Sequence, residues 1–389
     1  MPDTDLVIIG GGPAGLATAM SLIQRDPDWC ERLVVIEKES HPRHKLCGGG
    51  LTPLALLNLK RLGLRLQVPH VVANEARFEY KSRRVQLWGD PAVVLTRRQE
   101  FDAWLAKEAR KRGVRLLEET AVNSLERGDN GVEVQTSGPA YRAQAVVGAD
   151  GSKGYVRRWL DAREQPPHVA RLLEFNTPAA GSEPEFVQSF ARFDFRTTQD
   201  GLQGYYWDFP SVVEGQPSMN RGLYDGRVAS GRAKAKLIPI LRGSSQARGV
   251  SDSEIDIKGH PIHWFSPRNL FSGPRTLLVG DALGAEPLFG EGIGIALGHS
   301  AVAAETLHDA FREHSFDFSN YRRRMLTSYV GRYLMLRWAV ARLLYRFSEH
   351  DGFMHFAFTV ADLATKLLGS LSPVNDALDE RMTLNKAHI

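Results

Sequence analysis

Cysteine is scarce in this sequence, with only Cys30 and Cys47 among 389 residues. Two thiols cannot build the disulfide framework of a small secreted protein, and they fit a chain that works in a reducing compartment. The first five residues carry two acids and neither Lys nor Arg, which is not the composition of a signal peptide. We therefore expect a cytoplasmic protein.

Long apolar runs and an excess of one charge are also missing. No stretch reaches the roughly 18 uncharged apolar residues that a membrane-spanning helix needs. Lys and Arg number 49 against 45 Asp and Glu, and no motif for DNA or RNA recognition is present, so we expect no nucleic-acid partner. We predict no metal site. With 43% hydrophobic residues, the chain has enough apolar material for two or three domains, or for one fold with an inserted lobe.

The chain opens with a pattern typical of a β-α-β unit. Residues 6–9 form a short apolar run that predicts a buried parallel strand. Residues 10–15 read Gly-Gly-Gly-Pro-Ala-Gly, and a helix of small residues is expected to run from there to about residue 25. Residues 33–36 predict the second strand, which ends at Glu37.

The glycine segment fits G-x-G-x-x-G, a dinucleotide-binding pattern. Gly10 permits the tight turn, Gly12 lets the backbone approach a pyrophosphate, and Gly15 lets the helix pack closely on the strand. The start of the helix offers free N–H groups to the phosphates. Glu37 is placed to accept hydrogen bonds from ribose hydroxyls, and its charge disfavours a ribose 2′-phosphate.

Later segments favour FAD over NAD. Asp150 follows one predicted strand, and Asp281, at the end of another, can accept a hydrogen bond from a ribityl hydroxyl. The turn at Gly290 and Gly292 can place backbone N–H groups against the flavin ring, where negative charge develops on reduction. Arg98 begins an amphipathic helix and can reach the pyrophosphate as a charged donor.

These motifs, in this order, resemble the flavoprotein hydroxylase superfamily, whose prototype is para-hydroxybenzoate hydroxylase. The resemblance spans residues 6 to 300; Gly154 departs from it, because many members carry Ser there. Together with the branch described next, it implies FAD-binding positions at Gly10, Gly12, Pro13, Ala14, Gly15, Glu37, Lys38, Arg43, Cys47, Gly48, Arg98, Asp150, Gly151, Gly280, Asp281, Pro287, Gly290, Gly292 and Ile293.

Within that superfamily, three segments look like the geranylgeranyl reductase family. Residues 42–53 resemble its P-R-x-K-x-C-G-G segment, residues 205–210 its Y-x-W-x-F-P motif, and residues 290–293 its G-E-G-I. Members use reduced FAD to saturate isoprenoid double bonds. The resemblance implies substrate contacts from Gly49, Tyr205, Trp207, Phe209 and Pro210.

The residues themselves leave alternatives open. Tyr205, Trp207 and Phe209 alternate along a strand and can form one apolar wall, but ordinary core packing gives the same pattern. Cys47 can be a small buried hydrophobe, a proton donor or a thiol that tunes the flavin. Arg43 and Lys45 can bind a diphosphate headgroup or the cofactor's phosphates, or they can be solvated loop charges.

The sequence thus predicts an FAD-dependent oxidoreductase that reduces carbon–carbon double bonds of a hydrophobic isoprenoid. Only one nucleotide-binding pattern is complete, so electrons would come from transiently bound NADPH or NADH, or from an electron-donor protein. A monooxygenase acting on an aromatic or polycyclic substrate shares every FAD motif and is the main alternative. A halogenase fits less well, since its W-x-W-x-I-P is Tyr-x-Trp-x-Phe-Pro here. A flavin-binding sensor has no positive support.

The fold class expected is α/β, a Rossmann-like FAD-binding domain with an inserted antiparallel sheet and C-terminal helices. Residues 333–345 mix apolar side chains with Arg, which suits either peripheral contact with a membrane or a helix that caps the cavity. The predicted parts are a discontinuous FAD-binding domain (1–65, 96–165 and 255–310), a substrate lobe (66–95 and 166–254) and a helical region (311–389).

Overall fold

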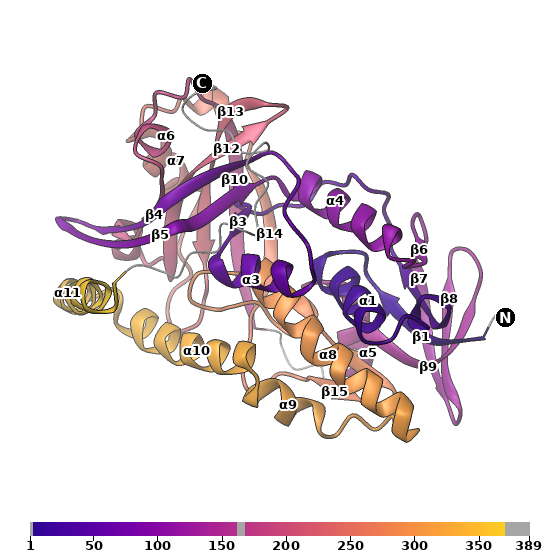
Figure 1. The fold of residues 1–389 in the computed structure, drawn as a ribbon. Helices are drawn as coiled ribbons and strands as arrows, with labels where there is room; N and C mark the ends of the chain where they lie inside the picture. Colours follow the sequence, from indigo (N-terminus) through magenta and orange to yellow (C-terminus); the bar gives the residue numbers. More distant parts are fainter. Residues whose placement is uncertain (1–2, 162–167, 370–389) are drawn as a thin grey trace.

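The computed structural model describes residues 3–161 and 168–369. It contains two sheets, helices packed against the first of them, and a row of C-terminal helices (Figure 1). The expected α/β class, with a Rossmann-like FAD-binding part, a second sheet and C-terminal helices, is confirmed.

The first sheet is the nucleotide-binding one. Its order is β15-β16-β9-β1-β2-β6, and the β7–β8 hairpin pairs with β9. The strands are β1 (Asp3–Ile9), β2 (Leu33–Ile36), β6 (Leu116–Leu117), β7 (Val122–Gly128), β8 (Gly131–Thr136), β9 (Tyr141–Gly148), β15 (Ser272–Gly273) and β16 (Thr276–Leu278). The pairs β1–β2, β1–β9 and β9–β16 are parallel, so their carboxyl ends meet at one edge. That edge is where doubly wound sheets bind ligands.

Helices pack around this sheet and against one another. They are α1 (Pro13–Arg25), α2 (Trp29–Arg32), α3 (Pro53–Arg61), α4 (Arg98–Lys111), α5 (Tyr155–Leu160) and α8 (Ile293–Glu313). Every residue of α1 from Pro13 to Leu22 is buried, because the helix lies between the sheet and α8. The Ser300 hydroxyl of α8 donates a hydrogen bond to the Ala14 carbonyl at 2.7 Å. The helix that begins in the glycine-rich segment 10–15 is therefore packed against α8, the helix that follows the turn at Gly290 and Gly292.

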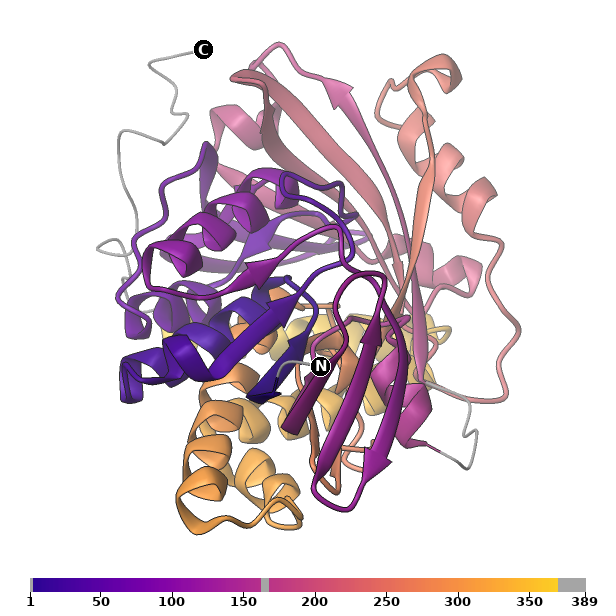
Figure 2. The ribbon, with the colours of Figure 1, turned by 90° about the vertical axis from the view of Figure 1, so that its right-hand side faces the viewer.

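The second sheet has the order β14-β10-β13-β12-β11-β4-β5-β3. Its strands are β3 (Gly50–Leu51), β4 (His70–Tyr80), β5 (Arg83–Thr96), β10 (Val169–Pro178), β11 (Phe190–Asp194), β12 (Gly204–Val213), β13 (Gln216–Asp225) and β14 (Lys258–His263). Every pairing is antiparallel except β4–β11, which is parallel because the chain passes through the first sheet between these two strands. Figure 2 shows the long strands of the second sheet above the first sheet.

Short helices join the strands, and three helices end the described chain. The short ones are α6 (Pro184–Val187), α7 (Leu237–Gln246) and the 3-10 turns η1 (Arg196–Asp200), η2 (Asp252–Glu254) and η3 (Gly280–Ala282). The final ones are α9 (Tyr321–Thr327), α10 (Tyr329–Phe347) and α11 (Asp351–Leu368), which run below the second sheet in Figure 1. Buried Met354 and Phe358 hold α11 in place, and Tyr80 of β4 donates to Asp351 at 2.6 Å.

Some local expectations need correction. The glycine-rich sequence of residues 41–53 predicts a loop, and residues 55–64 predict a helix. The structure places β3 within that segment, and α3 begins at Pro53 because Thr52 caps it, accepting a hydrogen bond from the Ala55 N–H at 3.4 Å. Strand β7 was not expected at all. The sequence pattern also predicts helix from about residue 321 to residue 371, and the end of that segment lies outside the described residues. The domain boundaries stay a prediction. Among the described helices, none is long and apolar enough to cross a membrane.

Candidate active site

The glycine turn after β1 leaves the start of α1 open. The Gly10 backbone has φ +114°, and a Cβ there would lie 2.4 Å from the Ala149 carbonyl oxygen. A Cβ on Gly15 would meet the Gly10 carbonyl oxygen at 2.0 Å, so neither position accepts a side chain. Gly12 is the N-cap residue, and no side chain caps the helix. The free N–H groups of the first turn, where Pro13 and Ala14 lie, are thus available to phosphate oxygens.

The acid after β2 lies against this turn. Glu37 is buried, and its carboxylate accepts hydrogen bonds from the Gly11 N–H at 2.9 Å and the Glu39 N–H at 3.1 Å. The carboxylate is therefore held beside the glycine turn, as its expected role with a ribose requires. Lys38 points into solvent and lies 3.5 Å from Glu39, so its side chain is not part of this cluster.

Two buried guanidinium groups flank the α1 terminus and share one carboxylate. Arg98 donates to both oxygens of Asp102, at 2.8 and 2.9 Å, and the Nη2 of Arg43 lies 3.2 Å from Asp102. The Arg43 side chain would be 3.3 Å from a Cβ on Gly12. Burial by itself lowers the pKa of Arg98, but Asp102 outweighs it and raises that pKa above its usual value. Asp102 was missed in the sequence, although its i,i+4 spacing from Arg98 could have signalled it.

Lys45 lies on the same loop as Arg43 and is half-buried. Its Nζ lies 3.0 Å from the Nε2 of His260. Burial lowers the pKa of Lys45, and Arg98 and Arg43 lower it further, although Asp281 opposes them. Burial also lowers the pKa of His260 to about 4, with Lys45 as the next cause. His260 is therefore neutral near pH 7 and can accept a hydrogen bond from the Lys45 ammonium.

The Asp-Gly motif after β9 is partly structural. One oxygen of Asp150 accepts a hydrogen bond from the Val156 N–H at 3.0 Å and so holds the start of α5, while its other oxygen has no hydrogen-bond partner among the described residues. Gly151 has φ +79° and open space around it. A Cβ on Gly154 would lie 2.2 Å from the Asp150 carboxylate. The departure from Ser at Gly154 thus has a steric reason.

The third motif meets the first at the same edge. Gly280 has φ +59°, and a Cβ there would lie 2.7 Å from the Cβ of Ala14. Asp281 accepts a hydrogen bond from the Ser152 hydroxyl at 3.1 Å, and its other carboxylate oxygen would be 3.4 Å from a Cβ on Gly292. The predicted ribityl-binding acid and the predicted flavin-binding turn therefore lie side by side.

A buried glutamate shapes the turn that follows. Glu286 accepts hydrogen bonds from the N–H groups of Leu288 at 2.6 Å and Phe289 at 2.8 Å, beyond Pro287. Burial raises the pKa of Glu286 to about 7, with Arg337 and the two N–H groups opposing. Gly290 follows with φ +73° and leads into α8, whose N-cap Gly292 makes no side-chain cap. The N–H groups near Ile293 thus stay free.

A cavity of about 310 Å³ lies between this turn and the second sheet. Its wall is mostly aromatic, with side chains from β4, β11, β12, β13 and the turn after Glu286, namely Phe78, Phe193, Tyr205, Trp207, Phe209, Tyr224 and Phe289. Its other side consists of residues expected at the flavin, namely Cys47, Gly48, Gly290, Gly292 and Ile293. Gly49 also lines it. The volume and the apolar lining are typical of a small-molecule site.

The aromatic wall is held by hydrogen bonds from its polar ends. Tyr205 donates to the Phe289 carbonyl at 2.5 Å, Tyr224 donates to the Pro287 carbonyl at 2.9 Å, and the Trp207 indole N–H donates to Asn220 at 2.7 Å. Pro210, expected at the substrate, does not line the cavity. Successive strand residues face opposite sides, so Pro210 points away when Tyr205 and Trp207 point in.

One end of the cavity is polar. Glu291 accepts hydrogen bonds from the Thr52 hydroxyl at 2.5 Å and the Tyr333 hydroxyl at 2.9 Å. The Arg337 guanidinium lies 5.0 Å from the centre of the Tyr333 ring and 5.1 Å from that of Phe289. Burial raises the pKa of Glu291, whereas Thr52, Tyr333 and Arg337 each lower it. Tyr333 and Arg337 belong to α10, so this helix closes one side of the cavity.

Cys47 and Glu174 form a protonatable pair beside the cavity. Burial raises the pKa of the Cys47 thiol, which accepts a hydrogen bond from the Gly49 N–H at 3.4 Å. Burial also raises the pKa of Glu174 to about 7, although the Cys47 backbone N–H, Arg97 and Arg98 oppose it. Glu174 was missed in the sequence. A single acid within the apolar run of β10 was the available signal.

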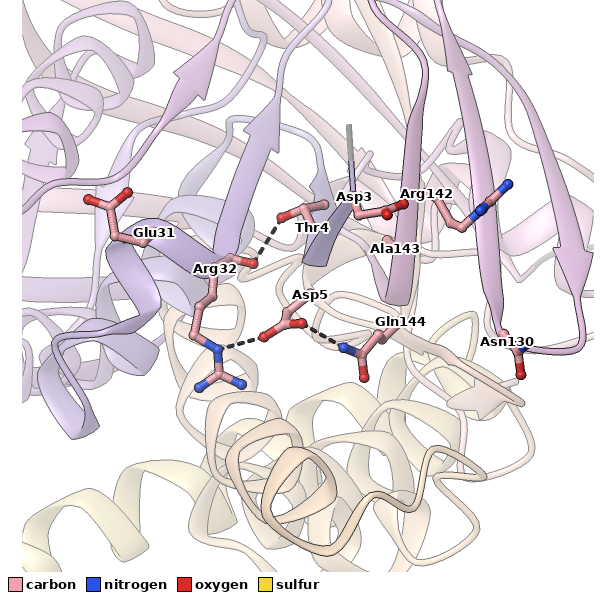
Figure 3. A pocket seen from close by; sticks show the side chains of 9 residues that line it. All are labelled: Asp3, Thr4, Asp5, Glu31, Arg32, Asn130, Arg142, Ala143 and Gln144. Atoms are coloured by element: carbon pink, nitrogen blue, oxygen red, sulfur yellow. Dashed lines mark hydrogen bonds and ion pairs between the residues drawn. The ribbon is translucent and has the colours of Figure 1, made fainter. Parts of the chain in front are cut away.

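A second hollow, of about 470 Å³, lies at the opposite end of the first sheet (Figure 3). Its polar groups already bind one another: Arg32 donates to Asp5 at 2.6 Å, and Gln144 donates to the other oxygen of Asp5 at 2.6 Å. The hollow is at the amino end of β1, away from the glycine turn. Parallel sheets bind ligands at the carboxyl end, so we assign this hollow no function.

The residues at the carboxyl edge fit FAD. The open start of α1, Arg43 with its Nε lacking a hydrogen-bond partner among the described residues, and the open oxygen of Asp150 could meet phosphates and hydroxyls. The fold and site therefore define a dinucleotide-binding flavoprotein. The family model described as FAD binding domain matches residues 3–317, and the chain belongs to this family. It is an FAD-dependent oxidoreductase.

Two relatives match along most of their length. The chain is 27% identical to a menaquinone reductase of Mycolicibacterium smegmatis over 397 residues, covering 96% of this chain and 93% of that protein. It is 26% identical to digeranylgeranylglycerophospholipid reductase 1 of Methanothermobacter thermautotrophicus, covering 86% of each.

Among solved structures, a geranylgeranyl bacteriochlorophyll reductase-like protein of Thermoplasma acidophilum gives a TM-score of 0.76 at 18% identity, covering 97% of this chain and 95% of that one. PqsL of Pseudomonas aeruginosa, a probable FAD-dependent monooxygenase, gives 0.65 at 19% identity, covering 90% and 97%. At these identities the likeness shows the fold alone.

Gly290→Ala is expected to lower both stability and FAD content. The new Cβ would lie 2.7 Å from the Tyr224 ring, in a backbone with φ +73°. Gly215→Ala is the control, because Gly215 has φ +78° with nothing within 4 Å. We expect the control to lose about 1 kcal/mol and Gly290→Ala roughly 2–3 kcal/mol. Urea unfolding and flavin absorbance of the purified proteins measure this. Equal losses and equal flavin content would contradict the role of the Tyr224 contact.

Proposed function

We propose that this protein reduces carbon–carbon double bonds of an isoprenoid substrate with reduced FAD. The observation that carries the proposal is the aromatic cavity, because it shares its lining with Gly48 and with the Gly290–Ile293 segment. An apolar chain held against those residues would lie next to the flavin-binding part of the site. The two named reductases among the relatives act on substrates with isoprenoid chains, which supports this choice.

The protein's own residues would bind and orient the chain and keep water away. Tyr205, Trp207 and Phe209 offer a rigid apolar wall, and the hydrogen bonds of the wall leave no polar tip turned to the substrate. Thr52, Tyr333 and Arg337 supply the polar end, which suits the headgroup of an amphipathic lipid. Reduced FAD, when bound, supplies a hydride to one alkene carbon, and a proton must reach the other.

Two groups of this chain are placed to hold that proton. The raised pKa of Cys47 keeps its thiol protonated at neutral pH, and the thiol lines the cavity. Glu174 lies behind Cys47 and can exchange a proton near pH 7. We therefore assign the proton to Cys47, with Glu174 as its reservoir. Electrons would come from transiently bound NADPH or NADH, or from an electron-donor protein.

The test is anaerobic. Purified protein loaded with FAD is reduced with dithionite and mixed with geranylgeranyl diphosphate, while flavin absorbance and product mass are followed. We expect the flavin to be reoxidised as the product gains two hydrogens for each bond. Ala76→Phe, which fills a cavity position on β4, should slow this reaction at least about tenfold with flavin content unchanged.

A different outcome would change the reaction assigned to the protein. If the flavin stays reduced until oxygen is admitted, and the product then gains an oxygen atom, the protein is a monooxygenase and not an ene-reductase. The FAD-binding residues would serve either reaction. The proposal also fails if reduced protein is reoxidised without any change in the mass of the isoprenoid.

A further inference from the structure

Helix α10 carries an exposed apolar stripe on the side opposite its buried face. The buried face consists of Leu334, Ala341 and Tyr345. The stripe is spaced by seven, four, three and four residues, which places its members on one side of a helix. They are Tyr329, Leu336, Val340, Leu343 and Phe347, and between 36% and 64% of each side chain is exposed. These five residues are the α10 stripe.

The stripe borders the mouth of the cavity. Tyr329 is both the first member of the stripe and part of the cavity lining. Tyr333 and Arg337, on the adjacent face of α10, point to the polar end of the cavity. An apolar chain that lay along the stripe would reach the cavity past Tyr329 without crossing open water.

Basic side chains border the stripe on its other flank. Arg332 precedes Leu336 by four residues and Arg346 follows Leu343 by three, so both are neighbours of the stripe. Together, α9 and α10 carry seven arginines and no acid over residues 321–347. The whole chain has an excess of only four basic residues, so the rest carries more acid than base. The segment of α9 and α10 is therefore net positive, and of its arginines Arg332 and Arg346 border the stripe, whereas Arg337 lines the cavity and Arg324 pairs with Asp309 at 2.6 Å.

The next helix repeats the pattern. Helix α11 has buried Met354 and Phe358 on one side and exposes Phe356, Val360, Leu363 and Leu367 on the other. Their spacing of four, three and four residues matches the last four members of the α10 stripe. Two successive helices thus keep large apolar side chains in solvent, which is a mark of a surface that binds something apolar.

We propose that the α10 stripe and its arginines dock the protein on an anionic lipid bilayer, from which the substrate chain enters the cavity past Tyr329. A helix with an apolar stripe and a basic flank lies in the headgroup plane of such a bilayer. The choice of substrate rests on the proposed function, whereas the docking itself does not. The two roles predicted for residues 333–345, membrane contact and capping of the cavity, are then compatible because they use different faces of α10. Tyr333 and Arg337 cap the cavity, and the stripe faces out.

The experiment uses the full chain loaded with FAD. Binding is measured by flotation with phosphatidylcholine vesicles, with and without phosphatidylglycerol, at low and high salt. The variants are L336E/L343E on the stripe and R332E/R346E on its flank. The control is I238E on α7, because Ile238 is 52% exposed but lies away from the stripe. Light scattering of each protein without vesicles reports its oligomeric state.

We expect the wild type to bind anionic vesicles at least about tenfold more tightly than neutral ones, with high salt weakening the preference. L336E/L343E should bind at least about tenfold more weakly, R332E/R346E should lose the preference for anionic lipid, and I238E should bind like the wild type. The inference is overturned if the wild type does not bind vesicles, or if the stripe variant binds equally well. It is also overturned if the wild type is an oligomer that L336E/L343E dissociates, since a second copy would then cover the stripe.

Reduction of soluble geranylgeranyl diphosphate without vesicles separates this inference from the proposed function. The stripe variant should keep that activity, because none of its changed residues lines the cavity. If neither protein reduces the soluble substrate but vesicle binding follows the pattern above, the proposed function fails and the docking surface stands. If both reduce it and neither binds vesicles, the docking surface fails and the proposed function stands.

Discussion

Asp102→Asn is expected to lower the free energy of unfolding by about 3–5 kcal/mol. Asp102 is fully buried and lies between the guanidinium groups of Arg98 and Arg43. Asparagine keeps the shape of the side chain but removes its charge. Arg98, about a tenth exposed, would then lose its ion pair with Asp102, and Arg43 would keep only its longer ion pair with Glu37, at 3.6 Å, out of its two with described residues. Urea unfolding of the protein without FAD measures the loss.

Two comparisons show whether the cause is the shared carboxylate. Asp309→Asn removes an even shorter ion pair, 2.6 Å from Arg324, but one that is partly exposed, so it should cost at most about 1 kcal/mol. Saturating FAD should recover part of the loss in Asp102→Asn, because its pyrophosphate brings negative charge to the same arginines. If both variants lose equal stability, and FAD changes neither, the guanidinium pair is not a phosphate site.

Glu174→Gln is expected to change how stability depends on pH. Burial raises the pKa of Glu174 from 4.5 to about 7, so the folded protein keeps this proton at pH values where the unfolded chain has released it. As pH rises from 4.5 to 7, the folded state is therefore destabilised relative to the unfolded one. The shift corresponds to about 3 kcal/mol. Above pH 7 this contribution stays constant.

Glutamine does not titrate, so the variant lacks this decline. Compared with the wild type, Glu174→Gln should gain up to about 3 kcal/mol between pH 4.5 and pH 8, with the whole gain below about pH 7. Glu286 has a similarly raised pKa and adds its own decline to both proteins, which cancels in the difference. Glu305→Gln, at an exposed position of α8, is the control. Parallel profiles for wild type and Glu174→Gln would mean that this carboxyl is not buried as described.

The local parts of the site could be predicted because they depend on residues close in sequence. The strand, glycine turn and helix around Gly12 are one continuous segment. The carbonyl group that excludes a side chain at Gly15 belongs to Gly10, and the one that excludes a side chain at Gly10 belongs to Ala149, just after the adjoining strand β9. The strand 33–36 was correct to the residue, since four consecutive apolar residues between polar ends have few alternatives.

Other features were hidden because they depend on residues far apart. Asp102 pairs with Arg98 within one helix, but its second pair, with Arg43, forms only because a residue 59 positions earlier folds back onto it. Glu174 matters because β10 brings it against the loop of Cys47. Pro210 could not be excluded from the substrate side until the face of β12 was known.

The sequence alone determined the nucleotide-binding unit, its likeness to FAD-dependent reductases and the order of the motifs. It could do so because turns, caps and strand ends are set by near neighbours and by backbone sterics. Tertiary structure alone decided that the aromatic wall and the flavin turn enclose one cavity, that burial raises the pKa of acids near it, and that α10 has one face in the cavity and another in solvent. Those properties arise from burial and long-range packing, which are set by strands and helices that meet only when the whole chain has folded.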